Sequence, residues 1–390
     1  MISTFRTQLK QLPRTMSTLS SSRLVIEKSP SARSCPPVNQ LVFGKTFTNH
    51  MLTVPWTQAG GWGTPKIEAY RPFTLEPSAV VFHYAPSLFE GLKAYRNPRG
   101  DILLFRPNKN MERMNGSAHR LALPTFEGDE LIKMIKKLIE VDQDWVPSEP
   151  GYSLYIRPTL MGTQPSLGVG APEEALLFVI LSPVGPYYSS VVKPVALEAN
   201  PDRVRAWPGG SGDSKIGANY APCVLPQLEA ASRGYQQNLW LYGAEHWLTE
   251  VGTMNLFIVL RTDDGLEVVT PPLNGMILPG VTRDSLLELL RAHESGASKL
   301  PLPSNIRVSE REINMGEIVA AADTGRLAEV FGAGTAVVVS PVDRIGYLGK
   351  DVHVPVGESG FGQVAEVLLN KLKAIQWGHE EHPWTTRITE

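Results

Sequence analysis

The sequence has little cysteine and no long hydrophobic run. Its two cysteines, Cys35 and Cys223, stand in no paired motif, which argues against a disulfide framework and against a zinc site. The longest clean apolar run, Ala175–Leu181, is far shorter than the roughly 20 residues of a membrane-spanning helix. The net charge of -2 gives no indication of nucleic-acid binding. We therefore expect a globular protein of a reducing compartment, with no metal site, no membrane span and no nucleic-acid partner.

Acidic residues are absent from the first 26 positions, which hold four basic side chains and many Ser and Thr. This composition is typical of a mitochondrial targeting segment. A disordered tail on a cytoplasmic protein has the same composition, so the mitochondrial matrix is the predicted location and the cytoplasm is the alternative. Residues 28–40 are rich in Pro and Ser. We predict that residues 1–40 form a targeting segment and a disordered arm.

The order of strand-like and helix-like segments predicts the fold class. Strands outnumber clean helices and do not alternate regularly with them, which favours two α/β domains with mixed sheets of the α+β type. Residues 41–185 are predicted to form a small N-terminal domain, 186–195 a linker and 196–390 a large C-terminal domain. The patterns predict helices over 129–143, 282–293 and 362–376, and strands over 175–181, 239–242, 255–260, 266–270 and 335–340.

A glycine-rich stretch, GGSGDSKIGANY, surrounds a single lysine, Lys215. A Walker phosphate loop requires Gly-Lys-Ser/Thr, whereas Asp213 and Ser214 separate Gly212 from the lysine and Ile216 follows it, so a nucleotide loop is disfavoured. Two interpretations stay open on these residues alone. The lysine is either exposed in a loop, or desolvated so that its amine loses a proton and forms an imine with a carbonyl compound.

Pyridoxal phosphate, a cofactor that such a lysine could hold, makes further demands on the chain. Its phosphate needs backbone amides, hydroxyl groups and an arginine, and the turns at 280–282 and 331–336 could supply the amides and hydroxyls. Its ring nitrogen needs an acid, for which Glu250 in the apolar stretch LTEVGTMNLF is the candidate. Each feature alone is equally typical of an ordinary turn or of a polar residue at a strand end.

Seven stretches, taken in order, resemble the branched-chain amino acid aminotransferases. They are HYAPSLFEGLKAY, LFRPNKNMERM, LYIRP, GGSGDSKIGANY, EVGTMNLF, PPLNGMILPGVTRDSLL and FGAGTA, and the resemblance runs from about Leu41 to about Trp384. The resemblance implies the two-domain fold type IV of pyridoxal-phosphate enzymes, like that of D-amino-acid aminotransferase. It also implies a homodimer with shared active sites, which reversibly transfers the amino group of leucine, isoleucine or valine to 2-oxoglutarate.

The same resemblance implies a role for each matching residue around the cofactor. Lys215 corresponds to the Schiff-base lysine, which also moves the proton in catalysis. Glu250 corresponds to the acid on the pyridine nitrogen, and Tyr220 to the tyrosine that binds the phenolate oxygen. Arg106 of LFRP is the expected phosphate-binding arginine. The other phosphate donors are expected at Val281, Thr282 and Thr335.

The substrate-binding residues are also implied by the resemblance. The backbone at Thr335 and Ala336 and the hydroxyl of Tyr84, which reaches in from the second subunit, are expected to hold the substrate carboxylate. Arg157 is expected to meet the γ-carboxylate of glutamate. Without the motifs, each aromatic residue would be interpreted as an ordinary core residue. The pocket wall is expected to consist of Phe43, Phe89, Tyr155, Tyr187 and Thr253, with Leu167 and Val169 lent by the partner subunit.

One departure from the family pattern follows the FGAGTA turn. Mammalian members have a Cys-x-x-Cys pair there, whereas this chain has Val337 and Ser340, which excludes thiol regulation at that site. Three alternatives to this function are a D-amino-acid aminotransferase or aminodeoxychorismate lyase of the same fold, a non-catalytic descendant, and a transaminase of a specialised pathway. The long motif series disfavours the first, and the presence of Lys215 and Glu250 disfavours the second. The third stays open.

Overall fold

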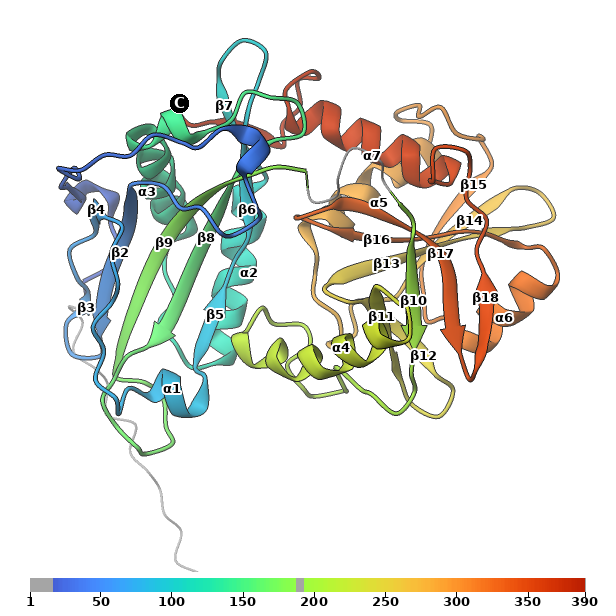
Figure 1. The fold of residues 1–390 in the computed structure, drawn as a ribbon, viewed down its shortest axis with the longest axis horizontal. Helices are drawn as coiled ribbons and strands as arrows, with labels where there is room; N and C mark the ends of the chain where they lie inside the picture. The colour runs from blue at the N-terminus through green and yellow to red at the C-terminus, as the bar shows by residue number, and fades with distance from the viewer. Residues whose placement is uncertain (1–16, 187–192, 390) are drawn as a thin grey trace, which may run out of the picture.

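The structure, a computed structural model, describes residues 17–186 and 193–389. Within them the chain forms two mixed sheets that stand side by side, the first drawn mainly in blue and green and the second in yellow to red (Figure 1). The spatial order of the first sheet is β1 (Val25–Ile26), β4 (Lys66–Ala69), β2 (His50–Thr57), β9 (Glu174–Val184), β8 (Ser153–Gly162), β6 (Leu92–Arg96), β7 (Ile102–Phe105) and β19 (Thr385–Arg387), with β3 (Gly61–Trp62) beside β2 and β5 (Ser87–Phe89) beside β8.

The second sheet closes on itself. Its first strand pairs both with the next strand in the order and with the sixth, so these strands form a ring in the described part of the chain. The predicted class of mixed sheets is confirmed. The order is β12 (Trp247–Val251), β11 (Gln237–Tyr242), β10 (Val195–Ala199), β17 (Val338–Tyr347), β16 (Leu327–Gly334), β13 (Met254–Arg261), β14 (Leu266–Thr270) and β15 (Ile306–Glu310), with β18 (Lys350–His353) beside β17.

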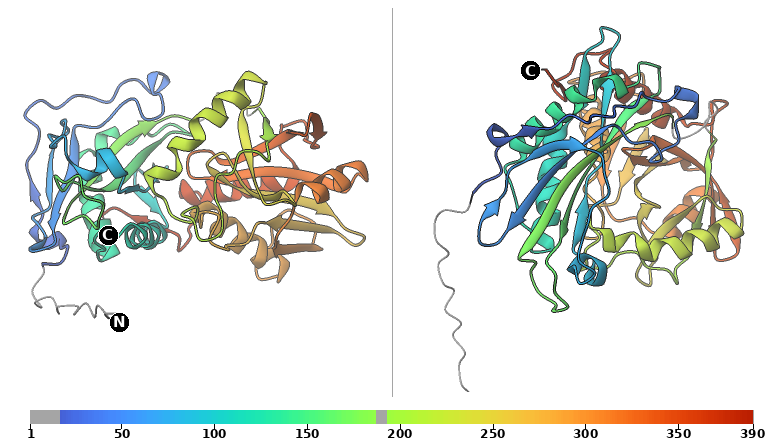
Figure 2. Two further views of the ribbon diagram at one scale, coloured as in Figure 1. Left: turned by 90° about the horizontal axis from the view of Figure 1, so that it is seen from below. Right: turned by 60° about the vertical axis from the view of Figure 1, so that its left-hand side comes forward.

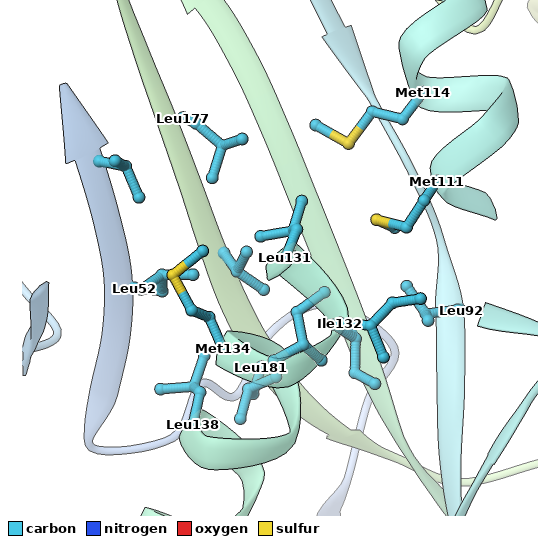
Figure 3. Close-up of a cluster of buried hydrophobic side chains, with 14 of the residues drawn as sticks. Leu52, Leu92, Met111, Met114, Leu131, Ile132, Met134, Leu138, Leu177 and Leu181 are labelled. Atoms are coloured by element: carbon cyan, nitrogen blue, oxygen red, sulfur yellow. The ribbon is translucent and has the colours of Figure 1, made fainter. Parts of the chain in front are cut away.

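One face of the first sheet is covered by two helices that follow each other in the chain. In the helix predicted over 129–143, Leu131, Ile135, Leu138 and Ile139 recur at helical spacing, and all four are fully buried. Figure 3 shows Leu131 and Leu138 among the side chains of the sheet strands. Asp129 lies inside the first turn and does not cap it. The covering helices are α2 (Pro107–Arg120) and α3 (Gly128–Val141).

The second sheet is buried on both faces around β13. Phe257 and Val259 pack in one apolar cluster with the helices predicted over 282–293 and 362–376, while Leu256 and Ile258 pack in another. Because successive side chains of a strand point to opposite faces, a strand covered on both sides is apolar at every position. The helices of this half are α4 (Val224–Ser232), α5 (Val281–Glu294), α6 (Met315–Asp323) and α7 (Gln363–Gln376).

The strand predicted over 335–340 is only partly correct. Residues 335–337 form a turn, and β17 begins at Val338, whose φ of 70° lies in the left-handed region. The remaining predicted strands lie within β9, β11, β13 and β14.

Both ends of the described chain join the first sheet. Leu19 is only 2% exposed and belongs to the apolar core of that sheet, and β1 pairs with β4. The structure therefore differs from the predicted disordered arm from residue 17 onward, whereas residues 1–16 lie outside the described residues. The last strand, β19, pairs with β7 in the first sheet, so its residues belong to that sheet and not to the predicted C-terminal domain. The other predicted domain boundaries stay predictions.

No helix in the described part of the chain is long and apolar enough to cross a membrane. Among the same residues, no group of three or more His, Cys, Asp or Glu side chains is arranged to hold a metal ion.

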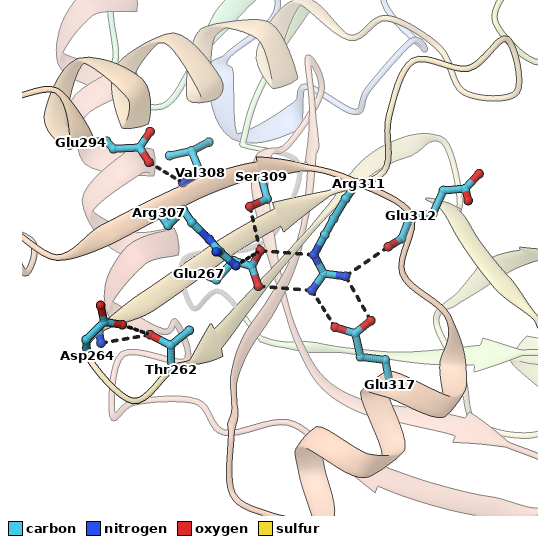
Figure 4. A network of polar contacts seen from close by, with 11 residues as sticks. Thr262, Asp264, Glu267, Glu294, Arg307, Val308, Ser309, Arg311, Glu312 and Glu317 are labelled. Atoms are coloured by element: carbon cyan, nitrogen blue, oxygen red, sulfur yellow. Dashed lines mark hydrogen bonds and ion pairs between the residues drawn. The ribbon is translucent and has the colours of Figure 1, made fainter.

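An ionic network joins β14, β15 and α6 at the edge of the second sheet (Figure 4). The carboxylate of Glu267 accepts hydrogen bonds from the Ser309 hydroxyl at 2.7 Å and from the Arg311 guanidinium at 3.2 Å, and it pairs with Arg307 at 2.8 Å. Burial raises the pKa of Glu267, but the hydrogen bonds from Arg311, Ser309 and Arg307 outweigh it and lower the pKa to about 2.

We expect acid to weaken the fold through Glu267. Its folded pKa of about 2 lies below the ordinary 4.5, so its stabilising contribution is complete above the higher value and is lost as the pH falls toward the lower one. Glu267→Gln should therefore lower the midpoint of thermal unfolding by several degrees at pH 7 and by much less near pH 3. Calorimetry of both proteins at the two pH values checks this, and an equal difference at both would contradict it.

Candidate active site between the two sheets

A cavity of about 430 Å³ surrounds the amine of Lys215, and its wall is drawn from both sheets. Phe89 on β5 and Tyr155 on β8 come from the first sheet, whereas Asn255 on β13 comes from the second. A neighbouring cavity of about 440 Å³ shares Arg113 with this one but is not lined by the lysine. The cavity of about 430 Å³ around Lys215 is therefore the candidate active site.

The glycine-rich stretch fixes the lysine backbone against its surroundings. The N–H of Lys215 donates to the Ser117 hydroxyl on α2 at 2.8 Å, and its carbonyl accepts from the N–H of Phe89 at 3.1 Å. Gly212 is required because a β-carbon there would lie 2.1 Å from the carbonyl oxygen of Met276. The stretch is thus a packed cradle rather than a free loop.

The amine of Lys215 is desolvated. Burial lowers its pKa to about 7, with a further contribution from the positive charge of Arg113, while Glu90 opposes the shift. The amine donates to the Tyr220 hydroxyl at 3.0 Å and lies 4.9 Å from the centre of the Phe89 ring. Of the two interpretations left open by the sequence, the desolvated lysine is the one that the structure contains. About half of such amines are neutral at pH 7, and the neutral form can act as a nucleophile or a base.

Tyr220 presents a phenol rather than a phenolate to the cavity. Burial raises its pKa to about 12, although the nearby Arg205 opposes the shift. Its ring packs against Phe89 with the ring centres 4.9 Å apart. A neutral phenol beside Lys215 can donate a hydrogen bond to an oxyanion.

Glu250 lies just behind the cavity wall on β12 and is 3% exposed. Its Oε1 accepts a hydrogen bond from the N–H of Leu278, a residue that lines the cavity, at 3.1 Å. Its Oε2 lies 2.6 Å from Nη1 of the buried Arg205, an ion pair, but receives no well-directed hydrogen bond from the described residues. Burial raises the pKa of Glu250, while Arg205 and the Leu278 N–H oppose the shift. The Oε2 atom of Glu250 can therefore still accept a hydrogen bond from a ligand.

Arg106 is not in the cavity, which corrects the prediction. It precedes α2 with a φ of 45°, and its guanidinium pairs with Glu288 at 2.5 Å and with Asp284 at 2.9 Å. The guanidinium also lies 4.5 Å from the centre of the Trp384 ring. These partners hold Arg106 on the outer side of α5, where it joins the C-terminal segment to the second sheet.

Arg113, one residue before the end of the same motif, lines the cavity instead. Its guanidinium binds both oxygens of the buried Glu90 at 2.6 and 2.8 Å and donates to the carbonyl of Pro279 at 3.1 Å. A guanidinium has five N–H donors, so donors remain for an anion in the cavity. Sequence reasoning missed Arg113, although the quoted stretch LFRPNKNMERM contains it.

The three other predicted phosphate donors do line the cavity. Val281 and Thr282 form the first turn of α5, whose initial N–H groups have no partner within the helix and favour an anion. Thr335 faces them from the turn between β16 and β17. A glycine is required at Gly280, because a β-carbon there would lie 2.0 Å from the side-chain oxygen of Asn255.

Most of the predicted substrate pocket is also brought together. Arg157 donates to the Tyr155 hydroxyl at 3.0 Å and lies 4.6 Å from the centre of the Phe89 ring. Its Nε is buried without a hydrogen-bond partner in the described part of the protein. The predicted residues that line the cavity here are Phe43, Phe89, Tyr155, Arg157, Thr253, Thr335 and Ala336.

Three of the predicted substrate-binding residues that the structure describes do not line this wall. Tyr84, Leu167 and Val169 are 45%, 67% and 84% exposed, and the Tyr84 hydroxyl donates to the carbonyl of Leu167. These three were expected to serve the partner subunit, and that expectation stays a prediction. Tyr187 lies outside the described residues.

The chain matches the family model for class IV aminotransferases over residues 87–345, so it belongs to that family. It is 53% identical to the mitochondrial branched-chain-amino-acid aminotransferase of Saccharomyces cerevisiae over 377 residues, which cover 95% of this chain and 94% of that protein. It is 51% identical to the cytosolic enzyme of the same organism, and the match covers 96% of this chain and 99% of that protein. It is 52% identical to the mitochondrial enzyme of Bos taurus, and the match covers 89% of this chain and 86% of that protein. Within the class, the chain belongs to the branched-chain-amino-acid aminotransferases, which confirms the resemblance.

Solved structures agree on the fold. The branched-chain amino acid aminotransferase of Escherichia coli superimposes with a TM-score of 0.67 at 24% identity, covering 86% of this chain and 99% of that one. The branched-chain aminotransferase of Thermoproteus uzoniensis gives the same TM-score, identity and coverage. The predicted fold of the type IV aminotransferases is therefore confirmed.

Proposed function

We propose that the protein reversibly transfers the amino group of L-leucine, L-isoleucine or L-valine to 2-oxoglutarate, giving branched 2-oxo acids and L-glutamate. The observation that carries this proposal is the desolvated amine of Lys215 in a cavity whose wall combines aromatic and aliphatic side chains with arginine, threonine and amide groups. The high identity to curated branched-chain-amino-acid aminotransferases over nearly the whole chain supports the choice of substrates.

The cavity fits pyridoxal phosphate, which the family implies. When bound, the cofactor supplies an electron sink that weakens the bonds at the α-carbon of the substrate. Glu250 has an acceptor oxygen left for the ring N–H, and Tyr220 can donate to the phenolic oxygen. Arg113 and the first turn of α5 would hold the phosphate, in place of the predicted Arg106.

The chain's own groups then perform the proton transfers. Lys215, with a pKa of about 7, can remove the proton from the α-carbon of the substrate and can deliver it to the cofactor. Its hydrogen bond to Tyr220 directs the amine in the cavity. Glu250, whose Oε2 pairs with Arg205 at 2.6 Å, would accept the N–H of the ring nitrogen and, as a carboxylate, would favour the protonated ring.

One pocket has to accept both aliphatic and acidic side chains. Phe43, Phe89 and Tyr155 offer an apolar surface for the branched side chain. Arg157 has a buried Nε without a partner among the described residues, so it can pair with the γ-carboxylate of glutamate.

The amino-donor assay tests the function. The purified protein with pyridoxal phosphate should convert 2-oxoglutarate to glutamate with L-leucine, L-isoleucine and L-valine, and not with D-alanine. Glutamate formed is measured by chromatography. Turnover with D-alanine alone would preserve the fold assignment and refute the proposed substrates.

We expect the phosphate-binding role to distinguish Arg113 from Arg106. Arg113→Lys keeps a charge beside Glu90 but loses the forked donor, so the affinity for pyridoxal phosphate should fall about 10-fold or more. Arg106→Gln should leave that affinity within about two-fold, since the Arg106 guanidinium binds α5 and Trp384 and does not line the cavity among the described residues. Equilibrium dialysis of the apoprotein with the cofactor measures both. A larger loss in Arg106→Gln would restore the original assignment.

We propose a homodimer in which Tyr84, Leu167 and Val169 complete the partner's site. Besides these residues, Phe82 on α1 (Val80–Tyr84) is 61% exposed and Leu228 on α4 is 63% exposed. The two helices lie near each other in Figures 1 and 2, and exposed apolar side chains that gather on one surface are typical of protein contacts.

Sedimentation should give a mass of twice 42.8 kDa for the protein. The pair of substitutions Phe82→Asp and Leu228→Asp should convert it to a monomer and lower transamination at least about 10-fold, because charge in a desolvated interface is costly. A monomeric wild-type protein with full activity would exclude shared sites.

We propose the mitochondrial matrix as the location, from the composition of the N-terminal segment, with the cytoplasm as the alternative. The relatives include enzymes of both compartments at similar identity. Fractionation of cells that express the full chain distinguishes the two locations.

A further inference from the structure

A buried lysine, Lys93, connects the two sheets next to the candidate active site. It lies on β6, where Leu92 and Ala94 face the core of the first sheet. Because strand side chains alternate, Lys93 and Tyr95 face the opposite way, toward the second half of the molecule. Tyr95 packs on Trp377 with the ring centres 4.6 Å apart, and Nζ of Lys93 donates to the carbonyl of Ala336 at 2.9 Å.

The turn that receives this hydrogen bond lines the active-site cavity. Residues 334–337 all contribute to its wall, and the backbone at Thr335 and Ala336 is expected to bind the substrate carboxylate. The turn is followed directly by Val338, whose φ of 70° is unfavourable for a β-branched residue. Such a conformation persists only where surrounding contacts hold it, and the bond from Lys93 is one of them.

Lys93 has no carboxylate partner in the described ranges, although it is only 8% exposed. Burial lowers its pKa to about 8, and the positive charge of Lys373 on α7 adds to the shift. The other titratable group on this side of β6 is Tyr95, whose pKa is raised by burial so that it stays neutral. Asn110, Thr282, Thr335 and Gln376 line the small space beside the lysine and carry no charge.

We propose that Lys93 is a positioning residue for the substrate carboxylate. Its hydrogen bond holds the 335–337 turn in the shape that presents the backbone donors, and its charge, which has no carboxylate partner among the described residues, attracts the bound carboxylate in addition to the cofactor phosphate. This inference rests on the proposed function, because it requires that this turn receive the carboxylate. A buried cation is costly without an anion nearby, which gives the unliganded site a preference for a negatively charged ligand.

A pair of ligands that differ only in charge tests the proposal on the holoenzyme. 4-Methylpentanoate carries the carboxylate and the branched chain of leucine, and 4-methylpentanamide is its neutral counterpart. In Lys93→Met, the affinity for the carboxylate should fall about 10-fold or more, while that for the amide changes less than about three-fold. Calorimetric titration measures both dissociation constants. A merely structural role would weaken both ligands equally, and that result would overturn the proposal.

The pH dependence gives a second, independent measurement. In the wild-type protein, the ratio of carboxylate to amide affinity should fall as the pH rises through about 8, because Lys93 loses its charge there. The ratio should be flat in Lys93→Met. In Lys373→Met, the fall should move to higher pH, since the repelling charge is removed. An unchanged pH profile in both variants would refute the role of the charge.

Failure of this inference and of the proposed function can be told apart. If wild-type protein loaded with cofactor binds neither 4-methylpentanoate nor L-leucine, the proposed function fails. If it binds both and Lys93→Met binds them as well as the wild type, the function stands and the role of Lys93 is refuted.

Discussion

Lys215→Ala should reduce amino transfer from L-leucine to 2-oxoglutarate by about 10⁴-fold or more, the upper range for loss of a positioned base. The substitution removes the amine that lies in the cavity, whereas the backbone contacts of the cradle to Ser117 and Phe89 remain. The fold should therefore persist, and the loss should appear in the turnover number rather than in the amount of soluble protein. Single-turnover measurements with saturating L-leucine give the rate.

Two controls separate the chemistry of this amine from its charge. Lys215→Arg keeps a cation but cannot act as a base at neutral pH, so its rate should fall as far as that of the alanine variant. Lys137→Ala removes an exposed lysine that pairs with Glu140 on the surface of α3, and this variant should have wild-type rates. In the apoprotein, an amine-directed reagent should label Lys215 with a midpoint near pH 7, the neutral form being reactive above it. Labelling that begins only above pH 9 would contradict the desolvated amine.

Glu250→Gln should lower the same rate by about 10²–10³-fold, the usual size of a lost electrostatic contact in an active site. The amide keeps the size of the side chain and its acceptor for the Leu278 N–H, but it carries no negative charge for the ring nitrogen. The affinity for the cofactor phosphate should change little, because Arg113 and α5 are untouched. Single-turnover rates and equilibrium dialysis measure the two effects separately.

The buried Arg205 requires a companion variant. Glu250→Gln leaves this guanidinium, 5% exposed, without its carboxylate, which is destabilising in itself. The double variant Glu250→Gln, Arg205→Met removes both charges and should restore much of the thermal stability without restoring activity. If activity returned together with stability, the loss in the single variant would be an effect of folding, and the catalytic role of Glu250 would be wrong.

The sequence motifs predicted the central part of the site. Lys215, Tyr220 and Thr335 are far apart in the chain and converge on one cavity, as the resemblance implied. Glu250 is bonded to a residue of its wall. These residues converge because each motif carries its residue at a fixed place on a strand end or turn. The roles themselves stay predictions until the experiments above are done.

Arg106 was the expected phosphate-binding arginine, but Arg113 lines the cavity, so a motif does not determine which of its side chains faces the site. Both arginines belong to one quoted stretch, and their letters do not say which side of α2 faces the cavity. The helix begins at Pro107, so Arg106 precedes it and turns outward to Glu288, whereas Arg113 lies nearly two turns further along and faces inward. The direction of a side chain depends on the helix start, which residue types alone fix poorly.

The chain ends were predicted least well, for a related reason. Composition suggested disorder up to residue 40, yet Leu19 reaches the core and β1 finds a partner strand about forty residues away. The strand β19 (Thr385–Arg387) pairs with β7 (Ile102–Phe105), which lies more than two thirds of the chain away. Pairing of this kind depends on distant partners, and no local pattern of hydrophobicity records them.

Because the wall of the active-site cavity comes from both sheets, a ligand bound there stabilises the docking of the two halves of the molecule. A ligand that touches Phe89 on one side and Thr335 on the other binds the docked arrangement and not the separated halves. By mass action, the docked state then gains about 2.7 kcal/mol when the ligand is present at 100 times its dissociation constant. Occupied molecules will therefore lose their structure in one concerted step, whereas empty ones can release one half before the other. Proteases that cleave transiently opened chains should therefore cut empty molecules faster than occupied ones.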